Sequence, residues 1–248
     1  MKIIIVPDVH GRTFWRECKD LINSVDKIIF LGDYLDPYID LDLVYPPEAF
    51  NEFVDILQFK KDNPDKVVLL LGNHDIHYLP ELLDAYGCRR FERRKHDISK
   101  LFVENIDLFK ITHCEGKYLF SHAGVLKGWL DYIQSDNFFE LWKVNNTEDF
   151  KNLNVENLTN LLFIEHGLSV LWMISRERGG RAMYGSCVWA DVHEHLNYFI
   201  DPLPDYYQIF SHSYYYPTLS EYYKDEHLAM LDCAKLFKLE NDELTEIR

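Results

Sequence analysis

The sequence predicts an α/β fold in a single domain spanning residues 1–248. Three observations lead to this prediction. Short apolar runs alternate with longer stretches of helical periodicity, as in domains built from strands and helices in turn. Hydrophobic residues make up 47% of the chain and aromatic residues 15%, which suits a globular protein with a sizeable core. The chain also has no internal repeat and no Gly/Ser linker that would mark a domain boundary.

The expected strands are short apolar segments, several of them rich in β-branched residues. In chain order they are Ile3–Val6, Lys27–Leu31, Val67–Leu71, Leu108–Thr112, Tyr118–Phe120, Tyr207–Phe210 and Leu228–Leu231. Two last segments, Lys235–Leu239 and Leu244–Ile247, flank Asn241-Asp242 and predict a β-hairpin.

The expected helices lie between these strands. Thr13 is an N-cap residue for a helix that ends near Ser24, and Pro47 suits the first turn of a helix that runs to about Lys61. Further helices are expected over Ile98–Asn105, within 125–144 and over 155–174. The segment Leu35–Pro47, rich in Asp, Tyr and Pro, is expected to be a loop.

The charge of the chain excludes some classes of partner. It has 26 Lys and Arg against 41 Asp and Glu, which gives a formal net charge of −15. Long-range repulsion therefore disfavours nucleic acid and anionic membrane surfaces as partners. The longest uninterrupted apolar runs, such as Val67–Leu71, are far shorter than the roughly 20 residues that a membrane-spanning helix needs. An acidic chain does suit the binding of metal cations.

The cysteines indicate a cytoplasmic location. The chain has five, an odd number, and none forms a Cys-x-x-Cys pair. A disulfide framework or a thiolate zinc knuckle is therefore not expected.

Residue types that ligate metals come directly after five of the predicted strands. The five segments are Asp8-Val9-His10-Gly11, Gly32-Asp33-Tyr34-Leu35-Asp36, Gly72-Asn73-His74-Asp75, Ser121-His122-Ala123-Gly124 and Ser211-His212-Ser213. Ligands of open α/β sheets bind beyond the carboxyl ends of the strands, so this placement indicates a site. The donors are carboxylates, imidazoles and one amide, a set that suits manganese, iron or zinc in open coordination. Each segment alone is weak evidence, but their combination makes an incidental arrangement improbable.

These segments, in this order, resemble the motifs of the calcineurin-like metallophosphoesterase superfamily. The resemblance is closest to its serine/threonine-type phosphoprotein phosphatase branch and bacterial relatives, and Trp189-Ala190-Asp191 is similar to a tryptophan segment of that branch. It implies a four-layer αββα sandwich, the calcineurin-like fold, with two divalent metal ions at the strand ends. Manganese is expected, with iron or zinc as alternatives.

The resemblance also implies a role for each motif residue. Asp8 and His10 would hold the first metal, and Asp33 would bridge both ions. The second metal would be held by Asn73, His122 and His212. The chain lacks the additional histidine after His212 that many superfamily members use for the first metal.

The implied reaction is attack on phosphorus by a hydroxide that bridges the two metals, which also neutralise the phosphoryl charge. His74 resembles the family's general acid, which protonates the leaving oxygen, and Asp36 would orient its imidazole. No covalent enzyme intermediate is expected.

The phosphate-binding arginines of the branch have no counterpart at their usual places. Pro37 follows Asp36 where the branch has Arg-Gly, and residues 189–212 contain no arginine. An arginine elsewhere is expected to bind the phosphate in bidentate fashion. The candidates are Arg12, Arg89 and Arg90, together with the arginine-rich segment Ser175–Arg181, which contains Arg176.

The leading functional hypothesis is therefore a dimetal hydrolase acting on phosphomonoesters, with a small molecule or a phosphoprotein as substrate. The alternative is a phosphodiesterase or dinucleoside polyphosphate hydrolase, which the same site supports. A catalytically silent scaffold of this fold is disfavoured because every assigned ligand is present, as are His74 and Asp36. The sequence specifies neither the physiological substrate nor the oligomeric state.

The metal assignment predicts that manganese-loaded protein hydrolyses p-nitrophenyl phosphate and that chelation abolishes the hydrolysis. Asp33→Asn should remove most of this activity, because the substitution weakens a ligand of both metals. Release of p-nitrophenolate, followed with and without EDTA, measures both effects. Hydrolysis that persisted in EDTA after exhaustive dialysis would contradict the metal dependence.

Overall fold

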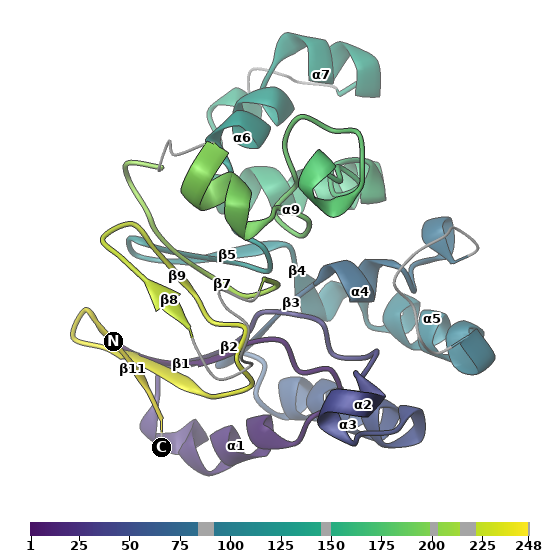
Figure 1. Ribbon diagram of the computed structural model, residues 1–248, viewed down its shortest axis with the longest axis vertical. Helices are drawn as coiled ribbons and strands as arrows, with labels where there is room; N and C mark the ends of the chain where they lie inside the picture. The colour runs from purple at the N-terminus through teal and green to yellow at the C-terminus, as the bar shows by residue number, and fades with distance from the viewer. Residues whose placement is uncertain (84–91, 145–149, 199–202, 214–221, 248) are drawn as a thin grey trace. The chain divides into compact units, whose positions relative to one another are not determined.

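The computed structural model describes residues 1–83, 92–144, 150–198, 203–213 and 222–247. The chain divides into two compact units (Figure 1). Unit 1 contains the described residues of 1–110 and 231–248, and unit 2 contains those of 111–217 and 221–230. Each unit holds one sheet, and the two units are described separately below.

The sheet of unit 1 is mixed and follows the order β11-β10-β1-β2-β3-β4. Its strands are β1 (Lys2–Val6), β2 (Lys27–Phe30), β3 (Val67–Leu70), β4 (Phe109–Lys110), β10 (Phe237–Glu240) and β11 (Glu243–Glu246). Strands β1 to β4 are parallel neighbours, and β10 pairs antiparallel with β1. The carboxyl ends of β1, β2 and β3 therefore lie along the same edge of this sheet.

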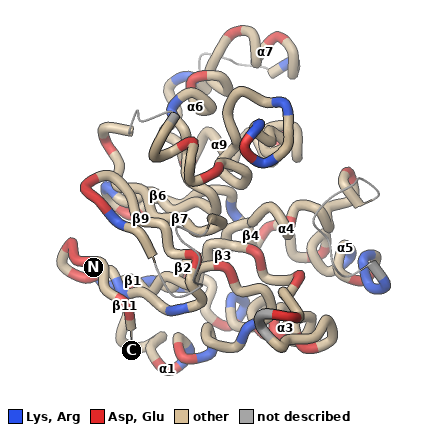
Figure 2. Tube along the Cα trace, in the orientation of Figure 1, with Lys and Arg blue, Asp and Glu red and all other residues tan. Residues whose placement is uncertain are grey.

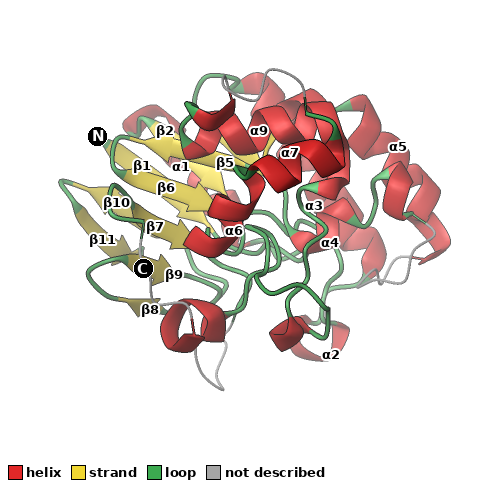
Figure 3. Ribbon diagram, turned by 90° about the horizontal axis from the view of Figure 1, so that it is seen from above, coloured by secondary structure: helices red, strands yellow, loops and turns green. Residues whose placement is uncertain are grey.

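The predicted C-terminal hairpin is confirmed. Strands β10 and β11 pair antiparallel across Asn241 and Asp242, and the hairpin extends the sheet beyond β1 (Figure 3). Both turn residues have positive φ, 53° and 63°. A two-residue turn of this kind matches the twist of the strands, and Asn and Asp tolerate the left-handed region better than most residues.

The helices of unit 1 are α1 (Cys18–Leu21), α2 (Ile39–Asp42), α3 (Pro46–Asp62), α4 (Asn73–Ile76) and α5 (Lys95–Glu104). The longest of them, α3, begins with Pro46 and Pro47 in its first turn and packs against β3. An aromatic cluster joins the sheet to α3 and α5. Its centre is Phe53, whose ring centroid lies 4.7 Å from that of Phe102 and 5.4 Å from that of Tyr34.

The sheet of unit 2 is also mixed and follows the order β5-β6-β7-β9-β8. Its strands are β5 (Thr112–Glu115), β6 (Tyr118–Ser121), β7 (Tyr207–Phe210), β8 (Tyr223–Lys224) and β9 (Leu228–Met230). Among the described residues, the α-helices of this unit are α6 (Lys127–Ile133), α7 (Asp136–Trp142) and α9 (Val155–His166). Helix α9 packs against β5, and α6 contacts α7. Strands β6 and β7 are parallel neighbours, so their carboxyl ends are also adjacent.

The segment Leu35–Pro47, expected to be a loop, contains the short helix α2 and the first two residues of α3. Three other predicted elements differ from the structure. The helix expected over Thr13–Ser24 is a short α-helix between two 3₁₀ turns. The i, i+3 spacing of the buried residues Trp15 and Cys18 suits the three-residue period of a 3₁₀ turn. The helix expected over 155–174 ends at His166, because Gly167 follows with a positive φ of 58°.

The apolar run Leu108–Thr112 is a third difference, since it is not one strand. Its residues Phe109–Lys110 form β4 in unit 1, and Thr112 begins β5 in unit 2. Ile111 separates the two strands and is fully buried. The other predicted strands lie within a residue or two of observed ones, whereas β8 was not predicted. The predicted α/β class is confirmed as two mixed sheets with helices.

Acidic residues are spread along the helices, strands and loops of both units and do not gather in one segment (Figure 2). The net charge of −15 is therefore a property of the whole chain. None of the helices in the described part of the chain combines the length and the apolarity that a bilayer span needs.

Phe53→Ala should destabilise the protein by about 3–5 kcal/mol, because it removes the ring at the centre of a close-packed aromatic cluster and leaves a cavity. Urea denaturation followed by tryptophan fluorescence measures the change in the free energy of unfolding. Val54→Ala on the same helix is the matched control, since Val54 is 39% exposed and should change stability by less than about 0.5 kcal/mol. Equal effects of the two substitutions would contradict the assigned role of the cluster.

Candidate metal centre

Unit 1 places its predicted metal ligands just after three parallel strands. Asp8 and His10 follow β1, Asp33 follows β2, and Asn73 is the first residue of α4 after β3. All four side chains are buried, with exposed fractions of 4% or less. The sheet therefore brings together residues that are up to 65 positions apart in the sequence.

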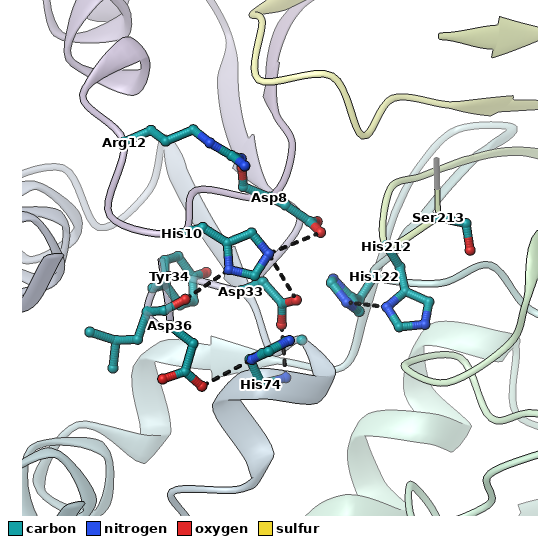
Figure 4. A network of polar contacts seen from close by, with 12 residues as sticks. Asp8, His10, Arg12, Asp33, Tyr34, Asp36, His74, His122, His212 and Ser213 are labelled. Atoms are coloured by element: carbon teal, nitrogen blue, oxygen red, sulfur yellow. Dashed lines mark hydrogen bonds and ion pairs between the residues drawn. The ribbon is translucent and has the colours of Figure 1, made fainter. Parts of the chain in front are cut away.

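The His10 imidazole faces two carboxylates (Figure 4). Its Nε2 lies 3.7 Å from Asp8 Oδ2 and 3.6 Å from Asp33 Oδ2. On the opposite side of the ring, Nδ1 lies 2.8 Å from the carbonyl oxygen of Leu35. A carbonyl only accepts, so Nδ1 carries the proton, and in the neutral ring the Nε2 lone pair faces the carboxylates. This tautomer is the one that a metal-ligating histidine requires.

The Asp33 carboxyl is buried and lies near other carboxylates. Burial raises the pKa of this carboxyl well above its ordinary value of 3.8, and the nearby carboxylates of Asp8, Asp75 and Asp232 raise it further. Three acceptor atoms, from Asp8, His10 and Asp33, thus converge in a buried place that has an excess of negative charge. A divalent cation would neutralise this charge, so the residues present fit the predicted metal site.

The Asp75 carboxylate connects the segments that follow β2 and β3 by hydrogen bonds. Its Oδ2 accepts hydrogen bonds from the backbone N–H groups of Asp33 and Gly72, both at 2.8 Å, and its Oδ1 accepts from that of Tyr34 at 3.1 Å. Burial raises the pKa of Asp75 to about 7, although these hydrogen bonds act in the opposite direction. The two loops also touch at Gly72, where an added Cβ would overlap the Asp33 carboxylate.

The predicted general acid and its partner are in contact. His74, in α4, has its Nδ1 2.9 Å from Asp36 Oδ2, and its backbone N–H donates to Asp33 Oδ1 at 2.9 Å. A carboxylate only accepts, so His74 donates from Nδ1 and directs Nε2 away from Asp36. Candidate ligand atoms of His10, Asp33 and His74 lie within 4.8 Å of one another. The proton-donor role of His74 stays a prediction.

Unit 2 brings the two predicted histidines together. His122 follows β6 and His212 follows β7, and the two side chains are buried. His122 Nε2 lies 3.1 Å from His212 Nδ1 (Figure 4). Two imidazole nitrogens that face each other at this distance can share a proton or turn their lone pairs toward a cation. The backbone of His212 has a positive φ of 69°, which is uncommon for a residue with a side chain.

The candidate phosphate-binding arginines have different surroundings. Arg12 is buried, and its Nη1 donates to the carbonyl oxygen of Asp8 at 3.2 Å. Arg176 is exposed. Arg89 and Arg90 lie outside the described residues.

A different arginine, Arg178, lies beside a predicted metal ligand. Its Nη2 donates to Ser213 Oγ at 2.5 Å and lies 3.5 Å from the His212 carbonyl oxygen. Its Nε lies 2.7 Å from Asp191 Oδ2. The sequence indicated the segment Ser175–Arg181 as a source of arginines, but it carried no signal that separates Arg178 from Arg176.

Asp191 is itself fixed by a buried carboxylate. Glu194, which is fully buried, accepts from the backbone N–H of Asp191 at 2.8 Å, from that of Gly185 at 2.9 Å and from Ser175 Oγ at 2.7 Å. The segment that carries Arg178 is thus held at both ends, which limits the motion of the guanidinium. Sequence reasoning did not single out Glu194.

One family of known proteins matches most of the chain. The family described as "Calcineurin-like phosphoesterase" matches residues 1–230. Two curated relatives are symmetrical bis(5'-nucleosyl)-tetraphosphatases. The one from Nitrosospira multiformis is 29% identical over 142 residues, which are 52% of this chain and 46% of the relative. The one from Enterobacter sp. is 28% identical over 137 residues, 52% of this chain and 45% of the relative. The chain spans about half the length of these curated relatives.

Two solved structures are similar over nearly the whole chain. A cold-active protein-tyrosine phosphatase from Shewanella sp. has 18% identity and a TM-score of 0.47, and the match covers 99% of this chain and 77% of that one. A protein serine/threonine phosphatase from Saccharomyces cerevisiae has 14% identity and a TM-score of 0.49, and the match covers 100% of this chain and 79% of that one.

Asp33→Asn should stabilise the metal-free protein at neutral pH. The raised pKa of Asp33 means that the folded state loses stability as pH rises from 3.8 through that raised value, and the amide removes this loss. The amide oxygen can still accept from the His74 N–H. A gain of about 1 kcal/mol would raise the midpoint of thermal unfolding by about 2–4 °C.

Differential scanning fluorimetry in EDTA and in manganese measures this effect. Manganese should raise the unfolding midpoint of the wild type and have little effect on Asp33→Asn, because the variant has lost a ligand. A variant that is less stable than the wild type in EDTA would show that charge crowding at Asp33 is not significant.

Proposed function

Because the chain belongs to the calcineurin-like phosphoesterase family, we propose that it is a metal-dependent hydrolase of phosphate esters. The observation that carries this proposal is the set of buried acceptor atoms around His10. Nε2 of this histidine faces the carboxylates of Asp8 and Asp33, and the Asp33 pKa is raised by burial and by neighbouring carboxylates. Such a set is costly without a cation and suited to binding one.

The proposed ligands are the six residues that the sequence predicts. Asp8, His10 and Asp33 would serve the first metal, with Asp33 shared, and the second metal would be held by Asp33 with Asn73, His122 and His212. Two divalent ions, manganese in the first instance, would supply positive charge at the phosphoryl group and a hydroxide near neutral pH. In this proposal residues 1–248 act as one metallophosphoesterase domain.

His74 is proposed to donate a proton to the leaving oxygen. Its contact with Asp36 supports this role, because a carboxylate that accepts from Nδ1 fixes the ring and favours a proton at Nε2. Both side chains are buried, so bulk water competes little for this hydrogen bond.

Arg178 and Arg12 are the arginines proposed to bind the phosphate. Arg178 is the stronger candidate, since Asp191 and Ser213 hold its guanidinium beside His212 while 28% of the side chain stays exposed to an incoming ligand. A guanidinium fixed in this way loses less entropy on binding a phosphate than a mobile one does. Arg12 donates to the backbone of Asp8, so it belongs to the loop of the first metal.

Phosphomonoesters, of a small molecule or a phosphoprotein, are the proposed substrate class. Dinucleoside polyphosphates are the second candidate, and the names of the curated relatives favour them. The same metals and proton donor suit both classes, because each substrate presents a phosphoryl group with an oxygen leaving group. Nucleic acid is disfavoured by the net charge of −15. The cysteine pattern supports a cytoplasmic location as part of this proposal.

A panel of four substrates under one manganese condition separates these candidates. It contains p-nitrophenyl phosphate, its bis-ester, diadenosine tetraphosphate and a phosphopeptide. The monoesterase proposal expects the largest kcat/KM on p-nitrophenyl phosphate or the phosphopeptide, and the second candidate expects it on diadenosine tetraphosphate. His74→Asn should lower kcat by about 10²–10⁴-fold on substrates with a poor leaving group and leave the metal content nearly unchanged.

Metal content is measured by atomic absorption on the same samples. Full turnover of a poor leaving group by His74→Asn would refute the proton-donor role. Failure of the metal-loaded wild type on all four substrates would refute the proposed function itself.

A further inference from the structure

Tyr78 lies behind the His74–Asp36 pair. Its hydroxyl donates to Asp36 Oδ1 at 2.5 Å, while the other carboxylate oxygen, Oδ2, lies 2.9 Å from His74 Nδ1. Tyr78 and Asp36 are both fully buried. The three side chains thus form a chain of hydrogen bonds that begins at the tyrosine hydroxyl and ends at the imidazole.

The Tyr78 ring has little freedom to move. It stacks on Phe102 of α5, with ring centroids 6.3 Å apart and an interplanar angle of 11°. Its backbone N–H donates to the Asp75 carbonyl oxygen at 3.0 Å, just after α4 ends. The hydroxyl is therefore held by a packed ring and a fixed backbone, so it defines where Asp36 Oδ1 must lie.

The hydrogen bond from Tyr78 has two effects on Asp36. It fixes one oxygen of the carboxylate, so the other oxygen keeps its direction toward His74. It also draws charge away from the carboxylate, because a donor to one oxygen weakens the carboxylate as an acceptor at the other. Both effects change the strength of the hydrogen bond between His74 Nδ1 and Asp36. The strength of that bond in turn affects how easily His74 releases the proton at Nε2.

We propose that Tyr78 is a positioning residue for proton donation by His74, acting through Asp36. The proposal rests on the proposed function, since it gives Tyr78 a part in the same proton transfer. In that transfer, a hydroxide derived from water forms a bond to phosphorus while the bond between phosphorus and the leaving oxygen breaks. The proton of His74 Nε2 moves to the leaving oxygen, and the imidazole is left neutral with its Nδ1 proton on the Asp36 side.

The effect of Tyr78 should depend on the leaving group. Phenolate is a much stronger base than p-nitrophenolate, so protonation of the leaving oxygen matters more for phenyl phosphate than for p-nitrophenyl phosphate. Tyr78→Phe should lower kcat for phenyl phosphate by about tenfold and change kcat for p-nitrophenyl phosphate by less than about twofold. The metal content of the variant should equal that of the wild type. Steady-state kinetics on the two esters and atomic absorption measure these quantities.

Tyr34→Phe is the matched control. Tyr34 is also fully buried, but its hydroxyl donates to the backbone carbonyl oxygen of Leu70, at 2.8 Å. Both substitutions remove one hydroxyl group from a packed ring of unit 1, and both should reduce thermal stability. Only Tyr78→Phe should change the ratio of the two kcat values.

The double variant Tyr78→Phe/His74→Asn shows whether Tyr78 acts through His74. Once the imidazole is absent, loss of the Tyr78 hydroxyl should cause no further change in the leaving-group ratio. A further loss confined to phenyl phosphate would overturn the proposal, as would equal losses on both esters in Tyr78→Phe alone.

Proton NMR of the metal-free protein tests the hydrogen-bond chain without turnover. The resonance of the His74 Nδ1 proton is assigned by its absence in His74→Asn. Tyr78→Phe should shift this resonance, and Tyr34→Phe should leave it in place. An unchanged resonance in Tyr78→Phe would overturn the coupling. A shifted resonance in a protein whose metal-loaded wild type hydrolyses neither ester would refute the proposed function while supporting the hydrogen-bond chain.

Discussion

The carboxylate of Asp75 is the contact on which the arrangement of unit 1's site residues depends. It accepts hydrogen bonds from three backbone N–H groups that lie beyond the ends of the strands. These groups belong to the two segments that lead to Asp33 and Asn73. Because this carboxylate must be buried to reach them, its own pKa rises to about 7 and its charge raises the pKa of Asp33. The side chain that builds the loops is thus also a source of the excess negative charge, which a bound cation would offset.

Backbone strain is a second common feature of the predicted site residues. His10, Asp33 and Asp36 in unit 1, and His212 in unit 2, all have φ between 45° and 69°. Non-glycine residues in this region cost about 1 kcal/mol or more each, and they persist where the surrounding structure fixes them. Here each follows, within six residues, a strand that is buried except at its first residue, so a rigid sheet supports each turn. The left-handed turn changes the direction of the chain abruptly and sets the direction of the side chain.

The strands were the most predictable part of the structure. Runs such as Ile3–Val6 are buried on both sides, so apolar and β-branched residues were sufficient to locate them. The helix expected over Thr13–Ser24 was less predictable, because periods of three and of 3.6 residues are hard to distinguish over so few residues. The split of Leu108–Thr112 between two sheets depends on the pairing of β4 with β3, a strand distant in sequence, whereas β5 pairs with the neighbouring strand β6. Local sequence does not encode the distant pairing.

The part of the candidate site that follows the strands was also predictable, whereas the part that depends on contacts between distant side chains was not. The residues Asp8, Asp33 and His74 follow strands directly, so their motifs and their positions both carried information. Tyr78 and Arg178 belong to no such motif. Their parts emerge only from contacts between side chains that folding brings together, the hydroxyl on Asp36 and the guanidinium on Ser213.

The C-terminal hairpin has a consequence for the order in which the chain can fold. Strand β1 precedes the loop of Asp8 and His10, and one of its two neighbours is β10, with Ile5 opposite Phe237. During synthesis β1 therefore has one open edge until residues 237–240 have left the ribosome, and the residues of unit 2 are made before then. An open edge invites pairing with other chains, so the nascent protein is most exposed to misassembly while the last strands are still missing.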